Sequence, residues 1–198
     1  MEMLRMDHIT KIYPNGFVAN KDVTFAVNEG EIHSLVGENG AGKTTLMKIL
    51  FGMEDKQGGD IFIREQKVKI TSPLDAISKG VGMVHQHFML LNSLTVAEKV
   101  VLGIEPMKNG LFDFEEAVVM TQKIADKYNF ALDARTRVKD LSVGQMQKVE
   151  ILKALYRGAD ILILDEPTAV LTPQETDELF VPLKRLTDNG HTIIFISH

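Results

Sequence analysis

The sequence predicts an α/β protein built on parallel strands, and three observations lead to this class. Apolar runs at 32–36, 81–84, 161–164 and 193–196 have the length and composition of buried parallel strands. Helical patterns lie between several of these runs. A glycine-rich loop follows the first run and leads into a helix that we expect to begin near Thr44.

The N-terminal part of the chain has a different pattern. The first thirty residues and the stretch 59–70 alternate between apolar and polar residues and are interrupted by turns. This pattern is typical of antiparallel strands with one solvent-facing side. We therefore expect a small antiparallel sheet beside the parallel core.

Capping residues mark where the helices begin. Helix ends are predicted at Gly103, Gly158 and Gly190. Between Thr95 and Gly158 helical signals dominate and no strand is predicted, so this part is expected to form a helical subdomain inserted into the α/β core. The predicted starts are Ser72-Pro73, Thr95 with Glu98, Asp113 with Glu116, Ser142 with Gln145, and Thr172-Pro173 with Glu175.

The composition is that of an ordinary globular protein, and it excludes several functions. The chain has 198 residues, of which 44% are hydrophobic and 25% charged, with a net charge of −5. This acidic balance argues against a broad nucleic-acid-binding face, so no nucleic acid is expected as a partner. No run approaches the roughly 18 apolar residues of a membrane helix, and the polar start is unlike a signal peptide. A cytoplasmic location is therefore the default expectation. The absence of cysteine excludes disulfides, thiolate catalysis and cysteine-zinc sites, and says nothing further about compartment.

Residues 37–45 carry the strongest functional motif of the chain. They satisfy G-x-x-x-x-G-K-[ST], the P-loop that binds the phosphates of a nucleoside triphosphate. Backbone N–H groups of such a loop converge on phosphate oxygens, and the following helix adds the positive end of its dipole. Lys43 is expected to contact the β- and γ-phosphates, and Thr44 to place its hydroxyl on Mg²⁺. The predicted nucleotide-binding residues of the loop are Gly37, Glu38, Asn39, Gly40, Ala41, Gly42, Lys43, Thr44 and Thr45.

Two carboxylates follow the apolar run 161–164. A P-loop enzyme needs such a pair at the carboxyl edge of a neighbouring strand. We expect Asp165 to hold Mg²⁺ and Glu166 to act as the general base that polarises the attacking water. Alone, the pair would be interpreted as a solvated turn after a core strand. Beside the P-loop it predicts nucleotide hydrolysis.

The segment Leu141-Ser142-Val143-Gly144-Gln145 decides the family. In this order and spacing with the other motifs, it resembles the signature sequence of ABC-type ATPases, the nucleotide-binding subunits of membrane transporters. The same residues are also a capping box at the start of an amphipathic helix, and both interpretations can hold together. The resemblance implies that Ser142, Gly144 and Gln145 close over the γ-phosphate bound by the opposite domain of a head-to-tail dimer. For this role Ser142 and Gly144 are expected to be exposed at the helix N-terminus.

Three further residues stand where the family has functional side chains. Gln86 resembles the loop glutamine that contacts Mg²⁺ and the attacking water. His198 resembles the switch histidine that contacts the γ-phosphate. Tyr13 resembles the aromatic residue upstream of the P-loop that stacks on adenine. Gln86, Glu166 and His198 are therefore the implied catalytic residues, and ATP with Mg²⁺ the implied ligands.

The resemblance covers essentially the whole chain and implies a more specific group. The stretches 81–90, 149–158 and 165–175 are similar to the ATPase of simple-sugar and nucleoside importers. In that group two tandem ATPase domains usually share one polypeptide, and this sequence is similar to the first. The implied partners are transmembrane permease subunits, a second ATPase domain and, indirectly, an extracytoplasmic solute-binding protein. The implied location is the cytoplasmic face of the cell membrane, where the chain is bound through the permease.

Two positions depart from the general ABC pattern. Val143 replaces the second glycine of the common L-S-G-G-Q. Thr172 stands where many ABC proteins carry an aspartate that communicates across the dimer. Both residues are at home in the sugar-importer group, and they bear on whether the two ATP sites are equivalent.

The resemblance implies one ABC-type nucleotide-binding domain over residues 1–198. Its expected parts are a P-loop NTPase (RecA-like) core, a flanking antiparallel β-subdomain and an α-helical subdomain inserted at about 88–158. ABC domains normally continue for several tens of residues beyond the switch histidine, so we expect the domain to be truncated at its C-terminus.

Two other functions are alternatives to transport. One is a soluble ABC-type ATPase not linked to transport, but such proteins usually carry long insertions or coiled coils, and no sustained heptad pattern is present. The other is an ATP-sensing module that does not hydrolyse, against which Glu166 argues. A GTPase is disfavoured because Asn20-Lys21-Asp22 only superficially matches the guanine-reading N-K-x-D motif and precedes the P-loop.

Overall fold

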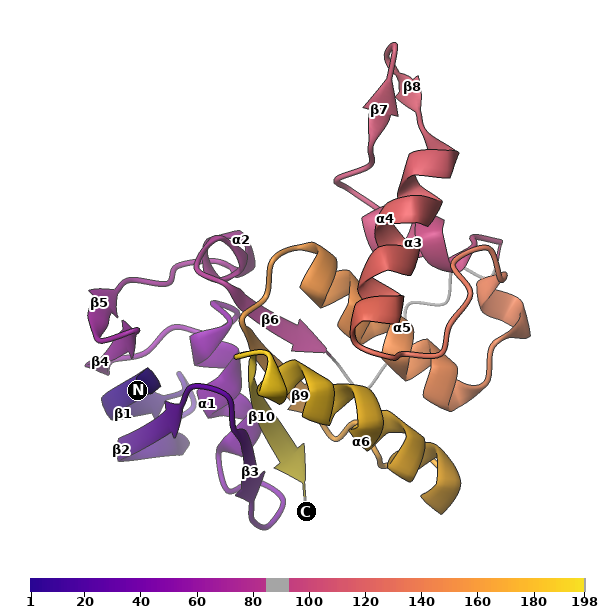
Figure 1. The fold of residues 1–198 in the computed structure, drawn as a ribbon. Helices are drawn as coiled ribbons and strands as arrows, with labels where there is room; N and C mark the ends of the chain where they lie inside the picture. The colour runs from indigo at the N-terminus through magenta and orange to yellow at the C-terminus, as the bar shows by residue number, and fades with distance from the viewer. Residues whose placement is uncertain (85–92, 198) are drawn as a thin grey trace.

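The computed structural model describes residues 1–84 and 93–197. Its elements form three groups: an antiparallel sheet at the N-terminal side, a parallel sheet in the middle, and a set of helices on the opposite side (Figure 1). The expected fold class, an α/β core with a flanking antiparallel sheet and inserted helices, is confirmed.

The parallel sheet contains the four strands that the apolar runs predict. They are β3 (Ile32–Val36), β6 (Val81–Val84), β9 (Ile161–Asp165) and β10 (Thr192–Ser197). Their order in the sheet is β3-β10-β9-β6, and every pair is parallel. The expectation that all four runs are buried is wrong for β3, because it is an edge strand of the described sheet and Val36 is 63% exposed.

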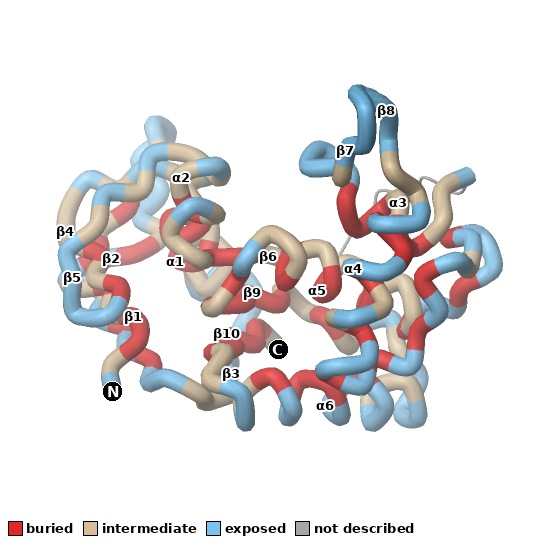
Figure 2. The backbone as a smooth tube through the Cα atoms, turned by 45° about the horizontal axis from the view of Figure 1, so that its top comes forward, coloured by how far each residue is buried: buried red, intermediate tan, exposed pale blue. Residues whose placement is uncertain are grey.

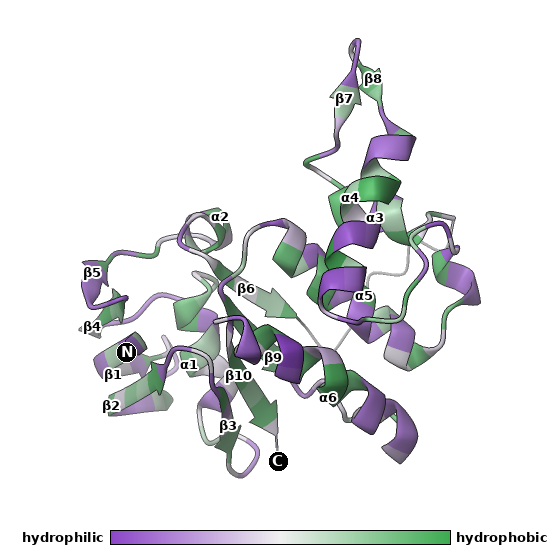
Figure 3. Cartoon of the chain, in the orientation of Figure 1, coloured by the Kyte–Doolittle hydropathy of each residue, from purple (hydrophilic) through white to green (hydrophobic). Residues whose placement is uncertain are grey.

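Side chains of β9 and β10 alternate between two hydrophobic cores. Ile161 and Ile163 face the core shared with the antiparallel sheet, while Leu162 and Leu164 face the core formed with the helices. This alternation follows from the two-residue period of a strand. The buried backbone is red in Figure 2, and β6, β9 and β10 are green in the hydropathy view of Figure 3. Burial of each such side chain stabilises the fold by about 1.5–3 kcal/mol.

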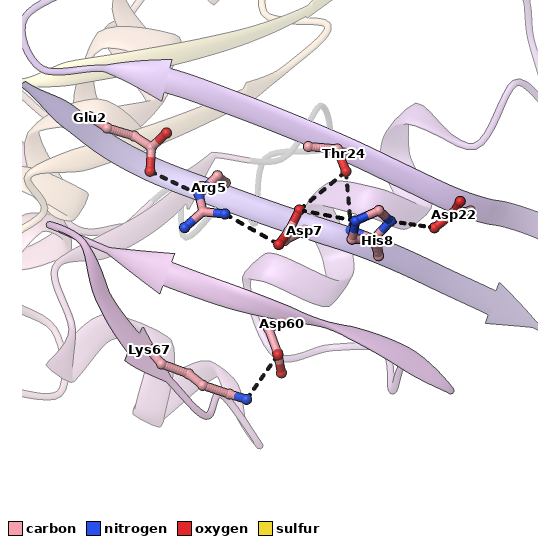
Figure 4. Close-up of polar contacts among 8 residues, drawn as sticks. All are labelled: Glu2, Arg5, Asp7, His8, Asp22, Thr24, Asp60 and Lys67. Atoms are coloured by element: carbon pink, nitrogen blue, oxygen red, sulfur yellow. Dashed lines mark hydrogen bonds and ion pairs between the residues drawn. The ribbon is translucent and has the colours of Figure 1, made fainter.

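The antiparallel sheet covers one face of the parallel core, as predicted. Its order is β2-β1-β4-β5, and α1 and α2 pack between the two sheets. Charged side chains line the solvent side of this sheet, with Arg5 and Asp7 on β1 and Lys67 on β5 (Figure 4). The bounds are β1 (Glu2–Ile12), β2 (Val18–Asn28), α1 (Lys43–Leu50), β4 (Gly58–Ile63), β5 (Gln66–Val68) and α2 (Pro73–Ser78).

The remaining helices begin at the predicted caps. Thr95, Ser142 and Thr172 each form a complete capping box, and Asp113 accepts a hydrogen bond from the N–H of Glu116. The boundary expected near residue 88 for the helical subdomain lies outside the described residues. The bounds are α3 (Val96–Val101), α4 (Phe114–Lys127), the 3₁₀ turn η1 (Val138–Asp140), α5 (Val143–Tyr156) and α6 (Pro173–Asp188).

A β-hairpin interrupts the helical part, and the expectation of no strand between residues 95 and 158 is wrong. Strands β7 (Met107–Lys108) and β8 (Leu111–Phe112) pair around Asn109 and Gly110, which both have positive φ (53° and 80°). Asn-Gly is the preferred sequence for a two-residue hairpin turn of this kind, so this dipeptide was the missed signal. The hairpin projects from the helices and is exposed (Figures 1 and 2).

Across residues 1–84 and 93–197, the structure contains no helix that is both long and apolar enough to span a membrane.

Candidate functional site

The P-loop connects the carboxyl end of β3 to the start of α1. Gly42 is the N-cap of α1 with φ 85°, and having no side chain it makes no capping bond. The first N–H groups of the helix, from Lys43 to Thr45, therefore keep no intrahelical partner and are available to an anion.

Lys43 folds back over this loop. Its Nζ donates to the carbonyl oxygen of Gly37 and, at 2.9 Å, to that of Glu38. An ammonium has three N–H donors, and two of them are used in this way among the described residues. The cation is therefore held against the backbone of the loop that the motif assigns to phosphate binding.

Gly42 is fixed by close packing against β2. A Cβ atom at this position would lie 2.2 Å from the carbonyl oxygen of Ala19 and 2.7 Å from Nδ2 of Asn20. Asn20 is buried, donates to the carbonyl oxygen of Gly42 at 3.3 Å, and has no partner for Oδ1 within the described residues. Asn20 was not predicted to take part in this site. The available signal was an asparagine, a residue type depleted in strands, inside a predicted strand.

The carboxylates Asp165 and Glu166 lie at the same edge of the sheet as the P-loop. In the parallel register, Asp165 pairs with Ile196 and Val36 pairs with Ser197, so the ends of β9, β10 and β3 are nearly level. The expectation of a directly neighbouring strand is wrong, because β10 lies between β3 and β9. Glu166 has φ 49° and donates its N–H to the carbonyl oxygen of Ile196 at 3.1 Å, which ends the strand.

The donor set of this edge fits a hard divalent cation such as Mg²⁺. Thr44 supplies a hydroxyl and Asp165 a carboxylate, and Mg²⁺ is typically bound by one or two such side chains together with substrate phosphates and water. Within the described residues there is no cluster of three or more His, Cys, Asp or Glu side chains, so a metal cage made by the protein alone is not present there.

Tyr13 lies beside the start of α1. Its hydroxyl is 3.4 Å from Oγ1 of Thr45, which brings a ring from the end of β1 to the P-loop helix. Lys11 Nζ stands 5.0 Å from the centroid of the Tyr13 ring and forms an ion pair of 3.0 Å with Glu54. Phe17, which is 52% exposed, stacks loosely on Tyr13 with ring centroids 6.2 Å apart. Neither Lys11 nor Phe17 was predicted to lie beside Tyr13. The available signal in the sequence was a second aromatic residue four positions after Tyr13.

The signature segment forms the N-terminus of α5. The capping box is confirmed: Ser142 Oγ accepts from the N–H of Gln145, and Gln145 Oε1 accepts from the N–H of Ser142. Ser142 is exposed as expected, but the expected exposure of Gly144 is wrong because Glu175 of α6 covers it. Glu175 was predicted only as part of the cap of α6.

The P-loop helix and the signature helix pack on opposite faces of the parallel sheet. Leu46 and Leu50 of α1 belong to the core on the antiparallel-sheet side, and Val149 and Leu152 of α5 belong to the other core. The structure thus has Tyr13 beside the P-loop helix and Asp165 at the same edge of the sheet as the P-loop, while the signature begins a helix on the opposite face. Gln86 and His198 lie outside the described residues.

These motifs on this fold define an ATP-binding cassette, and the family comparison agrees. A sequence profile for the ABC transporter family matches residues 20–169, so the chain belongs to that family.

Among its relatives, the guanosine import ATP-binding protein NupO of Bacillus subtilis is 50% identical over 97% of this chain and 38% of its own length. The glucose import ATP-binding protein TsgD13 of Haloferax volcanii is 49% identical over 98% of this chain and 40% of its own length. The chain therefore spans about two fifths of the length of these curated relatives.

Solved structures show the same architecture. The ADP conformation of MJ1267, an ATP-binding cassette of an ABC transporter, superposes with a TM-score of 0.87 at 26% identity, covering 100% of this chain and 82% of that one. The dimeric post-hydrolysis state of the cassette MJ0796, bound to ADP and phosphate, has a TM-score of 0.78 at 26% identity and covers 99% and 88% of the two chains.

Proposed function

We propose that this chain binds and hydrolyses ATP to drive an ABC importer for nucleosides or simple sugars. The observation that carries the proposal is the shared edge of the parallel sheet, where the P-loop, Lys43 and the Asp165-Glu166 pair meet in level register. The names of the relatives, which import guanosine and glucose, support the solute class.

In this proposal the P-loop N–H groups and Lys43 bind the phosphates, and the Tyr13 ring stacks on the base. Thr44 and Asp165 would hold Mg²⁺, which neutralises phosphate charge when bound. Glu166 accepts a proton from the attacking water as the γ-phosphate bond breaks. Gln86 and His198 are assigned to the same reaction from their sequence motifs alone.

A second ATPase domain completes the site. The packing of α1 and α5 on opposite faces of the sheet supports a role for Ser142, Gly144 and Gln145 at a nucleotide held by another cassette. The length of the relatives, about two and a half times the matched part, supports a partner cassette within one polypeptide.

The permease subunits are proposed to dock in a cavity of about 670 Å³ between the core and the helices. Phe51, Met53 and Ile77 line its core side, and Leu102 and Arg157 line its helical side. An apolar floor with charged rims suits a helix-ended loop of a membrane protein at the cytoplasmic face of the membrane. An extracytoplasmic solute-binding protein would act only through that permease.

ATP binding at the P-loop is tested with Lys43→Ala. Loss of a charge-assisted contact should weaken ATP binding by about 1.5–3 kcal/mol, or roughly 10- to 150-fold. Titration with a fluorescent ATP analogue measures this, with Lys48→Ala on the same helix as the matched control. Equal affinity of Lys43→Ala and the unmodified protein would remove Lys43 from the site.

The variant Glu166→Gln distinguishes ATP-driven transport from ATP sensing without hydrolysis. This variant should bind ATP with nearly unchanged affinity but release phosphate at a small fraction of the normal rate in the complete assembly. Uptake of radiolabelled nucleosides and pentoses by cells should fall in parallel. If phosphate release is normal, Glu166 is not the base; if hydrolysis is lost and uptake is unaffected, the ATPase does not drive import.

A further inference from the structure

Glu175, at the start of α6, occupies the phosphate-binding donors of the signature segment. Its Oε1 accepts from the Ser142 hydroxyl at 3.0 Å and from the Gly144 N–H at 3.2 Å. Its Oε2 accepts from the N–H and the hydroxyl of Thr172 at 3.1 and 3.2 Å. A carboxylate has about four acceptor positions, so the group is saturated by these four bonds.

These bonds use up the donors that the signature would offer to a phosphate. Ser142 has one hydroxyl proton, and its oxygen already accepts from the N–H of Gln145 at 3.3 Å. Gly144 has one N–H. While Glu175 stays in place, neither residue can donate to another anion.

The packing shows that this contact is close. A Cβ atom at Gly144 would lie 3.1 Å from both Cβ and Cγ of Glu175, so the glycine lets the carboxylate approach the helix N-terminus. One turn further along α6, Lys148 of α5 lies at the longer distance of 3.8 Å from Glu178, whose side chain is 51% exposed. The polar contact of Glu175 with α5 is therefore shorter than that of Glu178.

The ionisation of Glu175 follows from the same bonds. The N–H of Thr172, the N–H of Gly144 and the Ser142 hydroxyl hold its pKa below the ordinary value of a glutamate. The group that faces the signature is thus an anion under physiological conditions, and a phosphate beside it would be repelled.

We propose that the Glu175 carboxylate takes the place of the γ-phosphate at the signature when this domain is not closed on a partner cassette. The two cassettes can then close on ATP only after the carboxylate has left the signature. This inference rests on the proposed function, because it needs a partner cassette that presents ATP to Ser142 and Gly144. Displacement transfers the Ser142 and Gly144 donors from the carboxylate to the phosphate. Release of Glu175 also frees Thr172, so the loop before α6 changes its conformation when ATP is bound between the two cassettes.

As a competitor for the donors, Glu175 raises the ATP concentration needed for closure. Glu175→Gln keeps the shape but removes the charge, so in the complete assembly it should lower the half-saturating MgATP concentration for closure by about three- to tenfold. Closure is measured by energy transfer between fluorophores on this cassette and its partner. A purely structural role in capping α6 would have the opposite effect or none.

Two further variants make the experiment decisive. Glu178→Gln removes the same charge from the next turn of α6 and should leave the closure midpoint unchanged. Glu175→Asp keeps the charge but is too short to bridge Ser142 and Thr172, so its midpoint should shift in the same direction as that of Glu175→Gln. Affinity for ADP, which does not use the signature, should be equal in all variants.

The outcomes separate the two proposals. If the unmodified assembly does not close on MgATP, the composite ATP site and this inference both fail. If it closes and both Glu175 variants have a midpoint within twofold of the unmodified protein, or a higher one, only the stand-in role of Glu175 is overturned.

Discussion

At the scale of single residues, Gly42 meets two constraints at once. Its φ of 85° is unfavourable for any residue with a Cβ atom, and that atom would also collide with the Ala19 carbonyl oxygen. Gly40, in the same loop, has a φ of 81° but open space around its Cβ position. A comparison of substitutions at the two glycines therefore distinguishes the cost of backbone strain from the cost of a steric collision.

We predict that Gly42→Ala destabilises the protein well beyond Gly40→Ala. Gly40→Ala adds only the left-handed backbone strain of about 1 kcal/mol. Gly42→Ala adds the same strain and also displaces β2. Urea unfolding of both variants at one pH measures the difference. Equal losses would mean that the contact with β2 relaxes at no cost.

Tyr13→Ala should weaken nucleotide binding by about 1–3 kcal/mol, because a stacking ring is lost beside the P-loop. Tyr13→Phe keeps the ring and loses only the long contact of 3.4 Å to Thr45, so its affinity should stay close to that of the unmodified protein. Calorimetric titration with ATP compares the three proteins. A Tyr13→Phe variant as weak as Tyr13→Ala would point to the hydroxyl instead of the ring.

His8 provides a pH-dependent contact on the solvent side of the antiparallel sheet. Its Nδ1 lies 2.6 Å from Asp22, and Asp7 approaches its other ring nitrogen at 3.8 Å (Figure 4). The hydrogen bond to Asp22, and then the charges of Asp22 and Asp7, raise the pKa of His8 above its ordinary value. The stability from this contact is fully present below pH about 6.5 and is lost as the pH rises through the folded-state pKa.

We therefore predict that Asp22→Asn lowers the pKa of His8, and that the stability of the variant changes less between pH 6 and 8. NMR titration of the ring protons gives the pKa directly. Asp60→Asn, which loses its partner Lys67 on the same sheet, is the control and should leave His8 unchanged. An unchanged pKa in Asp22→Asn would assign the shift to Asp7.

At the scale of elements, local chemistry predicted most helices and strands correctly. Every predicted cap lies at the N-terminus of a helix, because Ser, Thr and Asp side chains satisfy N–H groups that the helix itself leaves open. The β7–β8 hairpin escaped notice because its strands are too short for a periodic pattern, and only its turn residues identify it.

Thr95→Ala tests one of these caps. Thr95 accepts from the N–H of Glu98 at 3.3 Å, and Glu98 in turn accepts from the Thr95 N–H at 2.7 Å. Loss of the hydroxyl should cost about 1 kcal/mol in the free energy of unfolding. Thr95→Ser, which keeps the hydroxyl, should stay near the unmodified value in the same denaturation experiment.

At the scale of the whole molecule, the sequence could not give the contacts between distant segments. The strand order β3-β10-β9-β6 is set by packing across the sheet, so the strand expected beside the P-loop was the wrong one. Likewise, Glu175 contacts Ser142 of the signature because α6 packs on α5. The sequence predicted each of these two residues only as part of its own helix cap. Local motifs therefore predicted which residues form the site, and the fold decided how they meet.

The sheet order also determines when the nucleotide site can form during synthesis. Strand β3 pairs with β10, and the Gly30 N–H binds Thr192 Oγ1 across a sequence separation of 162 residues. At translation rates of about 5–20 residues per second, the P-loop strand waits roughly 8–30 s for its partner to be made. Ribosome-arrested chains should thus gain ATP affinity only after residue 197 has left the exit tunnel. Until then one edge of β3 stays unpaired. Chaperones that bind extended segments therefore have their longest access to the nascent chain at this strand.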